Sequence, residues 1–550
     1  MAAAAAVITA AFYTAALYPA FAGNDSPETI SASNNLWLEH APGYPLHAML
    51  GKIATLIPLG GNAFRVNLLS ALLSSITAFL FVLLAGGRDT RGKAAAFFGA
   101  LVLAFSSTFW SQGIEAKGGI YILNAALTLV IFFCLDDIGD NNKFLLLAYV
   151  FGLSMANSYM SSAALIPAVL YACFKNKRRL PQGILFFLLG VTPYLYVFIR
   201  GAAQLPPRWT DTSTIGGFLF LVLRRGYPGP QPFDAGEAGF QAMEALKGFY
   251  NNFSFVILFA LPGARLLFKK NAGLCVSIVS AAALNIILAV FFNSVPKNAP
   301  WFITIYLMPA YLSAALLIAS GFSWAAGFLR GKKAVILIAA VPLVLAFSNQ
   351  GKNDASRDFV DYDFCNNLII TMGKDPLYLS YGDYFSMPMN YARFAARERS
   401  GIRNCDINSL SYPYGIGDLY KLTGVKLENG GGLKGAMGKI SAASGVYTNL
   451  YSGPAADYYL DAAKWKTCGI LFKYGTGPAG GDAVFDAYSY RGIIGEGKNY
   501  RDFEHPIVSI YPVAMARAYY IAERRGDMEK ARKLLSMAGA FPGVELKKSR

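Results

Sequence analysis

Residues 66–85 read VNLLSALLSSITAFLFVLLA and contain no charged side chain. A helix rises about 1.5 Å per residue, so about 20 apolar residues cross the ~30 Å hydrocarbon core of a membrane. Similar apolar blocks follow one another through residues 1–348 and do not continue into residues 349–550. This pattern predicts an α-helical polytopic membrane domain over 1–348 and a soluble domain over 349–550.

The composition is also that of a membrane protein. Of the 550 residues, 55% are hydrophobic and 15% are charged, whereas about a quarter of the residues in soluble proteins are charged. The net charge is +16, but much of the Lys and Arg lies in short clusters between apolar blocks, such as Arg330, Lys332 and Lys333. Cytoplasmic loops of membrane proteins carry such clusters. The positive charge therefore indicates topology and argues against a nucleic-acid partner.

We expect about eleven membrane-spanning helices. Residues 2–22 end in a sequence that resembles a signal-peptidase site, but they lack a basic start, which favours a retained first helix. The stretch 144–174 is predicted to turn near Asn157 and Ser158, because both of its flanks resemble cytoplasmic loops. The expected spans lie near 2–22, 66–85, 94–110, 120–136, 144–156, 159–174, 181–199, 252–268, 272–292, 301–322 and 334–348.

An odd number of spans that begins in the cytoplasm places the C-terminal domain outside it. We therefore expect a multi-pass membrane protein with an extracytoplasmic C-terminal domain. The outer loops carry the polar side chains that chemistry would need. They are Asp25, Glu28, His40, Arg65, Glu115, Lys117, Arg200, Arg208, Asp211, Arg224 and Arg225.

The soluble part predicts an α/β unit followed by helices. A strand at 377–381, a helix at 386–399 and a strand at 405–410 form a βαβ-like unit over about 375–415. Residues 507–540 are typical of a hairpin of two amphipathic helices. Three cysteines of this part, Cys365, Cys405 and Cys468, allow at most one disulfide, and their spacing does not predict a metal site.

The first outer loop, which we place at residues 23–65, is the most informative segment. Asp25 and Glu28 are three residues apart, so one helical turn places both carboxylates on the same side. His40 follows, before a Pro-Gly-Tyr-Pro turn that includes Tyr44. An alternative interpretation is a capping box, in which Asp25 caps the helix and Glu28 completes the box.

Several motifs recur in the order of a known family. They are D-S-x-E at 25–28, H-x-P-G-Y-P-L at 40–46, W-S-Q-x-x-E-A-K at 110–117, G-L-S-x-A-N at 152–157, R-W-T-D at 208–211 and R-R-G-Y at 224–227. Together they resemble a widespread bacterial family of multi-pass membrane proteins, long catalogued as a domain of unknown function. That family is related to the protein O-mannosyltransferase that acts on plexin-type immunoglobulin-like domains, within the GT-C glycosyltransferase superfamily. The resemblance extends over residues 1 to about 415. It departs from the family at Ser158-Tyr159, where a histidine is usual, and at Gly382-Asp383-Tyr384-Phe385.

The resemblance implies a GT-C glycosyltransferase that moves mannose or another hexose from a polyprenyl-phosphate carrier to an extracytoplasmic acceptor, such as a protein Ser or Thr. Because the family is bacterial, it also implies a location in the inner membrane, with the C-terminal domain in the periplasm. Asp25 would be the catalytic carboxylate, with Glu28 beside it. No cofactor is implied; a divalent metal on Asp25 and Glu28 stays open, although the sequence offers no third ligand. The implied substrate-binding residues are His40, Tyr44, Arg65, Glu115, Lys117, Asn157, Arg200, Arg208, Asp211, Arg224 and Arg225.

Two other classes fit part of the pattern. A flippase or transporter of lipid-linked sugars would place ionisable residues near the bilayer midplane, and a glycan ligase or polymerase would use the same outer face. Charges within the spans are nearly absent, and acidic groups collect on one side. This distribution favours an interfacial enzyme over a transporter.

Overall fold

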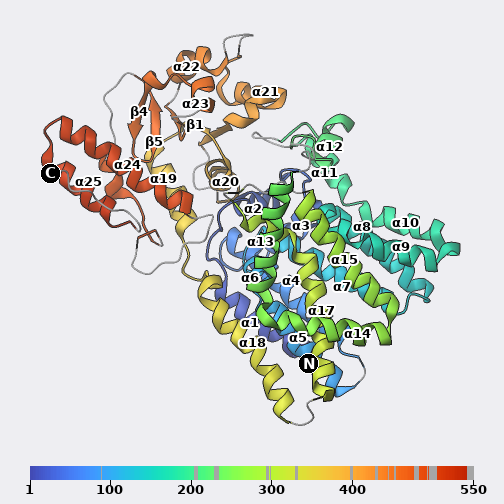
Figure 1. The fold of residues 1–550 in the computed structure, drawn as a ribbon. Helices are drawn as coiled ribbons and strands as arrows, with labels where there is room; N and C mark the ends of the chain where they lie inside the picture. Colours follow the sequence, from blue (N-terminus) through green and yellow to red (C-terminus); the bar gives the residue numbers. More distant parts are fainter. Residues whose placement is uncertain are drawn as a thin grey trace.

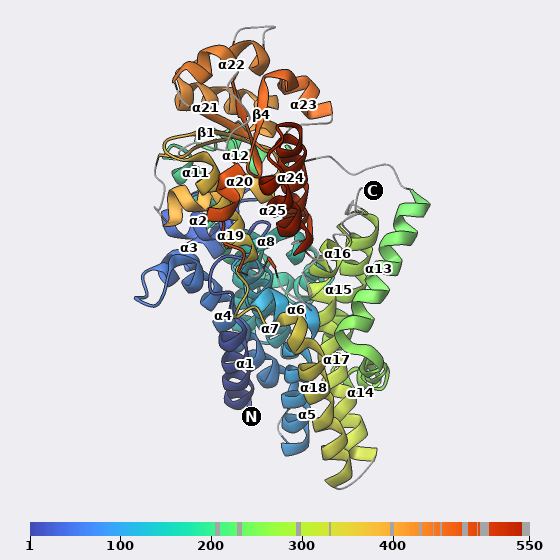
Figure 2. The same cartoon turned by 90° about the vertical axis from the view of Figure 1, so that its left-hand side faces the viewer.

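The computed structural model describes most of the chain. The described residues are 1–87, 89–203, 209–227, 234–292, 297, 299–328, 332–396, 401–427, 432–443, 445–450, 454–475, 482–491, 493–494 and 505–541. A bundle of helices forms one part, and a sheet with its own helices stands above it (Figures 1 and 2). The predicted combination of a helical membrane part and an α/β part is therefore confirmed.

Among the described residues, eighteen α-helices make up the first part. They are α1 (Ala2–Ala16), α2 (Ser26–Asn35), α3 (Pro45–Thr55), α4 (Asn62–Ala85), α5 (Thr90–Ala104), α6 (Ser107–Gly113), α7 (Gly118–Asp136), α8 (Asn141–Ser162), α9 (Ile166–Lys175), α10 (Leu180–Val191), α11 (Tyr194–Gly201), α12 (Ile215–Val222), α13 (Ala235–Phe253), α14 (Ala260–Lys270), α15 (Ala272–Phe291), α16 (Trp301–Tyr306), α17 (Met308–Phe328) and α18 (Lys332–Asn353).

Six helical segments of the described chain are long and apolar enough to cross a membrane, or eight if each bent pair counts as one span. This number is below the eleven expected spans. Two of the differences concern the expected span 2–22 and the expected pair of spans in 144–174. The first expected span is α1, whose 15 residues are short for a crossing. The expected spans 144–156 and 159–174 form a single apolar segment, Asn141–Lys175, of 35 residues.

That long segment turns where the sequence predicts a turn. Ser158 leaves the helical conformation, with φ −155° and ψ 94°. Across the turn, the hydroxyl oxygens of Ser154 and Ser162 are 2.7 Å apart. At the far ends, the Asn176 side-chain amide donates to the Ile138 carbonyl at 3.1 Å. The end of the second half therefore returns to the level at which the first half begins.

Small residues allow close helix packing, as is usual between membrane helices. Gly99 of α5 lies against Ala319 of α17, and Gly152 of α8 lies against Gly190 of α10. A Cβ at any of the three glycines would collide with the facing helix. The bundle that carries the first outer loop is consequently tightly held.

The second part contains a five-stranded sheet with strand order β2-β1-β3-β5-β4. Strand β1 pairs in parallel with β2 and β3, whereas β5 is antiparallel to β3 and β4. Its elements are α19 (Val360–Met372), β1 (Leu377–Ser380), α20 (Asp383–Tyr391), the π-helical turn η4 (Ala392–Ala396), β2 (Arg403–Asp406), α21 (Pro413–Thr423), α22 (Gly432–Ala443), β3 (Val446–Thr448), α23 (Pro454–Tyr459), β4 (Trp465–Cys468), β5 (Leu471–Tyr474), α24 (His505–Arg524) and α25 (Met528–Gly539).

The β1-α20-β2 succession has the connectivity of the expected βαβ unit. The helix begins earlier than 386, directly after Gly382 at φ 90°, and β2 begins two residues before the expected strand. Helices α24 and α25 form a hairpin where two amphipathic helices were expected, and they pack in one apolar core with α19 and Tyr378 of β1. In the described residues, Cys365, Cys405 and Cys468 are not joined in a disulfide. The domain boundary at 348 stays a prediction, since α18 runs through it.

The second part sits on the first outer loop. The Asn35 side-chain amide donates to the Phe394 carbonyl at 2.8 Å, and the Asn62 amide donates to the Ala395 carbonyl at 3.0 Å. The rings of Phe21 and Tyr391 lie 4.7 Å apart. This second part, the sheet domain, therefore covers the loop that carries Asp25 and Glu28.

Candidate active site

Asp25 lies at the start of α2, directly after Asn24, whose φ is 60°. Its side chain makes no capping hydrogen bond. Glu28 does not complete a capping box either, because both of its oxygens are engaged elsewhere. The capping-box alternative is therefore wrong, and the Asp25 carboxylate faces the interior of the site.

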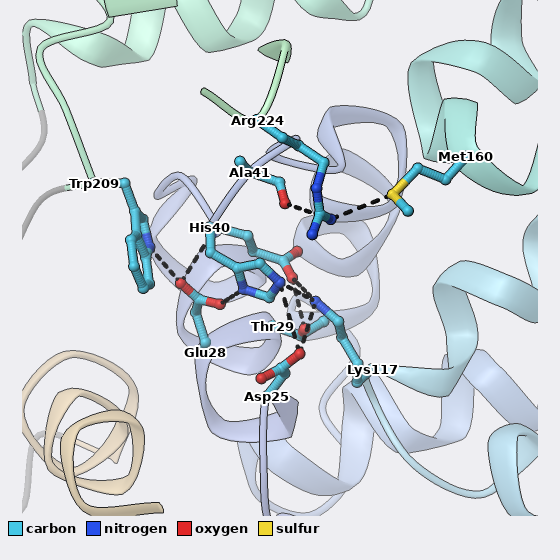
Figure 3. A network of polar contacts seen from close by, with 10 residues as sticks. Asp25, Glu28, Thr29, His40, Ala41, Lys117, Met160, Trp209 and Arg224 are labelled. Atoms are coloured by element: carbon cyan, nitrogen blue, oxygen red, sulfur yellow. Dashed lines mark hydrogen bonds and ion pairs between the residues drawn. The ribbon is translucent and has the colours of Figure 1, made fainter. Parts of the chain in front are cut away.

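Glu28 holds His40 in place (Figure 3). Its Oε2 is 2.5 Å from His40 Nδ1, and its Oε1 accepts hydrogen bonds from the His40 backbone N–H at 2.9 Å and from Trp209 Nε1 at 2.6 Å. With Nδ1 engaged, His40 presents Nε2 toward Asp25, 3.7 Å from Oδ2. Glu28 thus orients the imidazole, and His40 faces the carboxylate that the sequence singled out.

Lys117 joins the cluster from the start of α7. Its Nζ is 3.6 Å from Asp25 Oδ2 and 3.4 Å from Glu39 Oε2, and it lies 4.2 Å from the centre of the Tyr44 ring. Glu39 is fully buried and also accepts a hydrogen bond from the Thr29 hydroxyl at 2.7 Å. Sequence reasoning did not identify Glu39, although a carboxylate directly before His40 was a signal for it.

These neighbours set the charge state of the cluster. Burial raises the pKa of Asp25, but the charges of Lys117 and His40 outweigh burial and hold that pKa below its ordinary value. Burial and Lys117 lower the pKa of His40, while the carboxylates of Glu28 and Asp25 outweigh them and raise it. Burial raises the pKa of Glu39. Asp25 is consequently an ionised carboxylate at neutral pH.

Asp25 borders a cavity of about 640 Å³. The walls come from the first outer loop, α7, the turn at Ser158, α15, α16 and the segment after α12, with the sheet domain above. Apolar side chains line the end next to the helical bundle: Leu288, Ala289, Phe292 and Phe302. The cavity therefore has an apolar wall formed by α15 and α16 as well as polar groups around Asp25.

Arg224 supplies a cation on the cavity wall. It has a φ of 53°, and its guanidinium lies 4.2 Å from the centre of the Tyr227 ring and 3.4 Å from the Ala41 carbonyl, which accepts a hydrogen bond from Nη1. Arg225 is exposed and does not line the cavity. The adjacent arginines, equivalent in the sequence, therefore point to different surroundings.

The sheet domain adds two carboxylates to the cavity wall, Asp383 and Asp406. Burial in the wall, together with the charges of Asp25 and Asp406, raises the pKa of Asp383, although its side chain is open to the cavity. Sequence reasoning noticed the Gly382-Asp383 turn after a strand but did not connect it with Asp25. The two segments are far apart in the chain, so only the folded domain reveals their proximity.

Four other predicted residues have structural partners. Arg65 donates to the carbonyls of Thr55, Leu59 and Gly60, and Arg200 donates to those of Leu36 and Asn35. Asn157 donates to the Ile120 carbonyl beside the turn of α8. Asp211 accepts hydrogen bonds from Ser213. Within the described part of the chain, the cavity lining contains none of the four, so their substrate-binding roles stay predictions.

The described structure does not place either of the two remaining predicted residues, Glu115 and Arg208, on the wall of the cavity. Glu115 is half-buried between α6 and α7 and does not line the cavity in the described structure. Arg208 lies outside the described residues. A search of the described chain finds no group of three His, Cys, Asp or Glu side chains that could hold a metal ion.

Comparisons with known proteins agree with the motifs. Residues 25–181 match the family model described as the protein O-mannosyl-transferase TMEM260 N-terminal domain. The chain is 32% identical over 236 residues to protein O-mannosyl-transferase TMEM260 of Mus musculus, over 40% of this chain and 33% of that protein. It is 24% identical over 242 residues to protein O-mannosyl-transferase tmem260 of Dictyostelium discoideum, over 39% of this chain and 29% of that protein. The chain thus spans about a third of the length of these curated relatives.

The fold also matches a solved structure. The crystal structure of ArnT from Cupriavidus metallidurans bound to undecaprenyl phosphate superposes with a TM-score of 0.52, over 87% of this chain and 98% of that one, at 12% sequence identity. The resemblance drawn from the motifs and the predicted GT-C-like fold class are confirmed.

Proposed function

Since residues 25–181 match the N-terminal domain of TMEM260-type protein O-mannosyl-transferases, we propose that this chain is a membrane glycosyltransferase. It transfers mannose or another hexose from a polyprenyl-phosphate carrier to a hydroxyl of a protein outside the cytoplasm. The observation that carries the proposal is Asp25, a carboxylate that borders a large cavity with Arg224 on its wall and lies 3.6 Å from Lys117.

The donor enters from the membrane side. The apolar end of the cavity, with Leu288 and Phe292, suits a polyprenyl chain, and Arg224 suits the phosphate, because a guanidinium binds phosphate oxygens in a planar, charge-assisted arrangement. ArnT, whose fold this chain shares, was solved with undecaprenyl phosphate bound. The cavity of about 640 Å³ has room for a hexose next to the phosphate.

The reaction is a displacement at the anomeric carbon. The acceptor oxygen forms a bond to that carbon while the bond from carbon to phosphate oxygen breaks, and the departing phosphate keeps the electron pair. Asp25 accepts the proton of the acceptor hydroxyl, and Arg224 stabilises the added charge on the phosphate. A positioned base contributes typically about 10²–10⁴-fold. Lys117 and His40 keep Asp25 free of its own proton before the reaction.

The proposal is tested with Asp25→Asn in proteoliposomes that contain a polyprenyl-phosphate hexose. Asparagine keeps the size of the side chain but cannot take up the acceptor proton, so turnover should fall about 10²-fold or more. Glu28→Gln is the matched control: the amide can still accept from Trp209, and turnover should fall less. Near-normal turnover of a folded Asp25→Asn protein would remove Asp25 as the base. Movement of the lipid-linked sugar across the bilayer without transfer would favour the transporter alternative.

A further inference from the structure

The sheet domain covers the cavity with an edge whose geometry is suited to binding a ligand. Asp406 is the last residue of β2 and lies opposite Ser380, the last residue of the parallel strand β1. Asp383 comes shortly after Ser380 in the chain and begins α20. Ligands of α/β sheets bind outside the carboxyl ends of parallel strands. Both carboxylates line the cavity from this edge, so the edge of the sheet opens directly onto Asp25.

A narrow slot extends from the cavity along this edge. It has a volume of about 90 Å³, enough for the end of one side chain together with a few ordered waters. Its walls include Trp209 from the helical part and Asn408, Tyr412 and Tyr414 from the sheet domain. The rings of Tyr412 and Tyr414 are stacked, with centroids 5.3 Å apart and planes 11° apart. Tyr412 also donates to the Gly226 carbonyl at 3.2 Å, which ties the slot to the Arg224 segment.

The main cavity and the slot that extends from it differ in charge. Arg224 lines the main cavity, and Lys117 lies beside Asp25 at 3.6 Å. The slot is bordered by Glu28, Asp383 and Asp406, and among the described residues no Lys or Arg lines it. Carboxylates and electron-rich aromatic faces both attract an ammonium or guanidinium group. The slot would repel an anion and has the chemistry of a cation site.

We propose that this slot binds the acceptor polypeptide, and that it selects a Lys or Arg close in sequence to the acceptor hydroxyl. The cationic end of that side chain enters between the tyrosine pair and the carboxylates of Asp383 and Asp406. The hydroxyl is thereby brought to Asp25 from the side opposite the donor. The inference rests on the proposed function, since it assigns the acceptor of the same site.

Peptide binding tests the slot without requiring sugar transfer. The full-length protein in nanodiscs is titrated with three fluorescent peptides that contain serine next to Lys, norleucine or Glu, and anisotropy is measured. The Lys peptide should bind about tenfold more tightly than the norleucine peptide, and the Glu peptide more weakly than either. The preference should shrink as salt is raised, because part of the slot is exposed to solvent.

Asp383→Asn and Asp406→Asn, alone and combined, identify the source of the preference. The side-chain amide introduced by Asp406→Asn keeps an oxygen that can accept from the Asn408 backbone N–H, so the local turn is retained. The double variant should reduce the preference for Lys to below about threefold. Asp461→Asn is the control, because Asp461 is an exposed carboxylate of the same domain that pairs with Lys464; it should keep the tenfold preference.

The outcomes separate the inference from the proposed function. Equal binding of the three peptides, a preference for the Glu peptide, or binding of a free oligosaccharide in their place would overturn the slot assignment. A salt-sensitive preference for Lys that persists in the double variant would overturn it as well. If the Lys peptide binds selectively but no hexose is transferred to any hydroxyl, the slot stands and the proposed glycosyl transfer fails.

Discussion

Lys117→Met removes a buried cation that lies next to the carboxylates of Asp25 and Glu39, and its cost follows from burial. The side chains of Lys117 and Glu39 are 8% and 0% exposed, and Nζ and Oε2 are 3.4 Å apart. Loss of one partner from a buried ion pair destabilises proteins by about 3–5 kcal/mol, because the other charge stays buried without compensation. Methionine preserves the length and the apolar stem of lysine, so we expect a loss in this range that reflects charge and not a cavity.

A second substitution isolates that charge effect. In Glu39→Gln/Lys117→Met no charge is left at the fully buried position, and the glutamine carbonyl can still accept the hydrogen bond of Thr29. Asp25 also loses Lys117, but its side chain is 18% exposed to the cavity and keeps His40 nearby. The double variant should therefore regain about 2 kcal/mol relative to Lys117→Met, a coupling within the range measured for contacting residues.

Unfolding in detergent, followed by tryptophan fluorescence at pH 7, measures these differences. Lys143→Met is the matched control, because Lys143 pairs at 3.2 Å with Asp137, whose side chain is 66% exposed. Exposed pairs contribute only about 0–1 kcal/mol. The reasoning is refuted if Lys117→Met is as stable as Lys143→Met, or if the double variant is no more stable than Lys117→Met.

Three further predictions concern the donor, pH and topology. Arg224→Ala should raise the KM for the lipid-linked donor at least about tenfold while Arg225→Ala leaves it nearly unchanged, since of the two only Arg224 lines the cavity; equal effects in steady-state kinetics would contradict this. The raised pKa of His40 means that its contribution to stability is complete below its ordinary value of 6.5 and is lost as the pH rises through the folded-state pKa. Melting temperatures of the wild type should therefore fall from pH 6 toward pH 9 more than those of His40→Gln. Alkaline phosphatase fused after residue 360 should be active in bacteria, and activity of a cytoplasm-only reporter at that point would contradict the periplasmic assignment.

Local sequence was sufficient for the part of the site that is close together in the chain. Asp25 and Glu28 share one turn, and His40 follows after a short loop, so their association could be predicted from spacing and motif. Lys117 came from a separate motif on the same side of the membrane. The sequence could assign these groups to one face, and the structure shows them in contact as one cluster.

Membrane sidedness alone could not show where a cationic side chain points. Arg65 and Arg200 are predicted on the outer side, and their guanidinium groups donate to backbone carbonyls at the ends of short helices. Carbonyls at a helix end lack partners within the helix, and an arginine with five donors can satisfy several of them. This competing demand depends on the path of the loop, which hydropathy and charge patterns do not contain.

The distant contributions were the least predictable. Asp383 reaches the cavity because contacts such as the hydrogen bond from Asn35 of α2 to the Phe394 carbonyl of η4 hold the sheet domain on the first outer loop. Such contacts join segments that are 359 positions apart in the chain. A single sequence contains no periodic signal for them, so the strand and the Gly-Asp turn were predicted while their position above Asp25 was not.

The distribution of charge around Asp25 favours a separate route for each of the two proposed substrates. Arg224 and the apolar side chains of α15 and α16 line the cavity from the helical part, whereas Asp383, Asp406 and the stacked Tyr412 and Tyr414 line it from the sheet domain. A phosphate that approached from the sheet side would have to pass Asp383 and Asp406, and like charges oppose that approach. A cationic acceptor that approached from the side of the helical part would meet Arg224. Under the proposed function, the donor phosphate is therefore favoured on the side of Arg224 and a cationic acceptor on the side of Asp383 and Asp406, and Asp25 borders both sides.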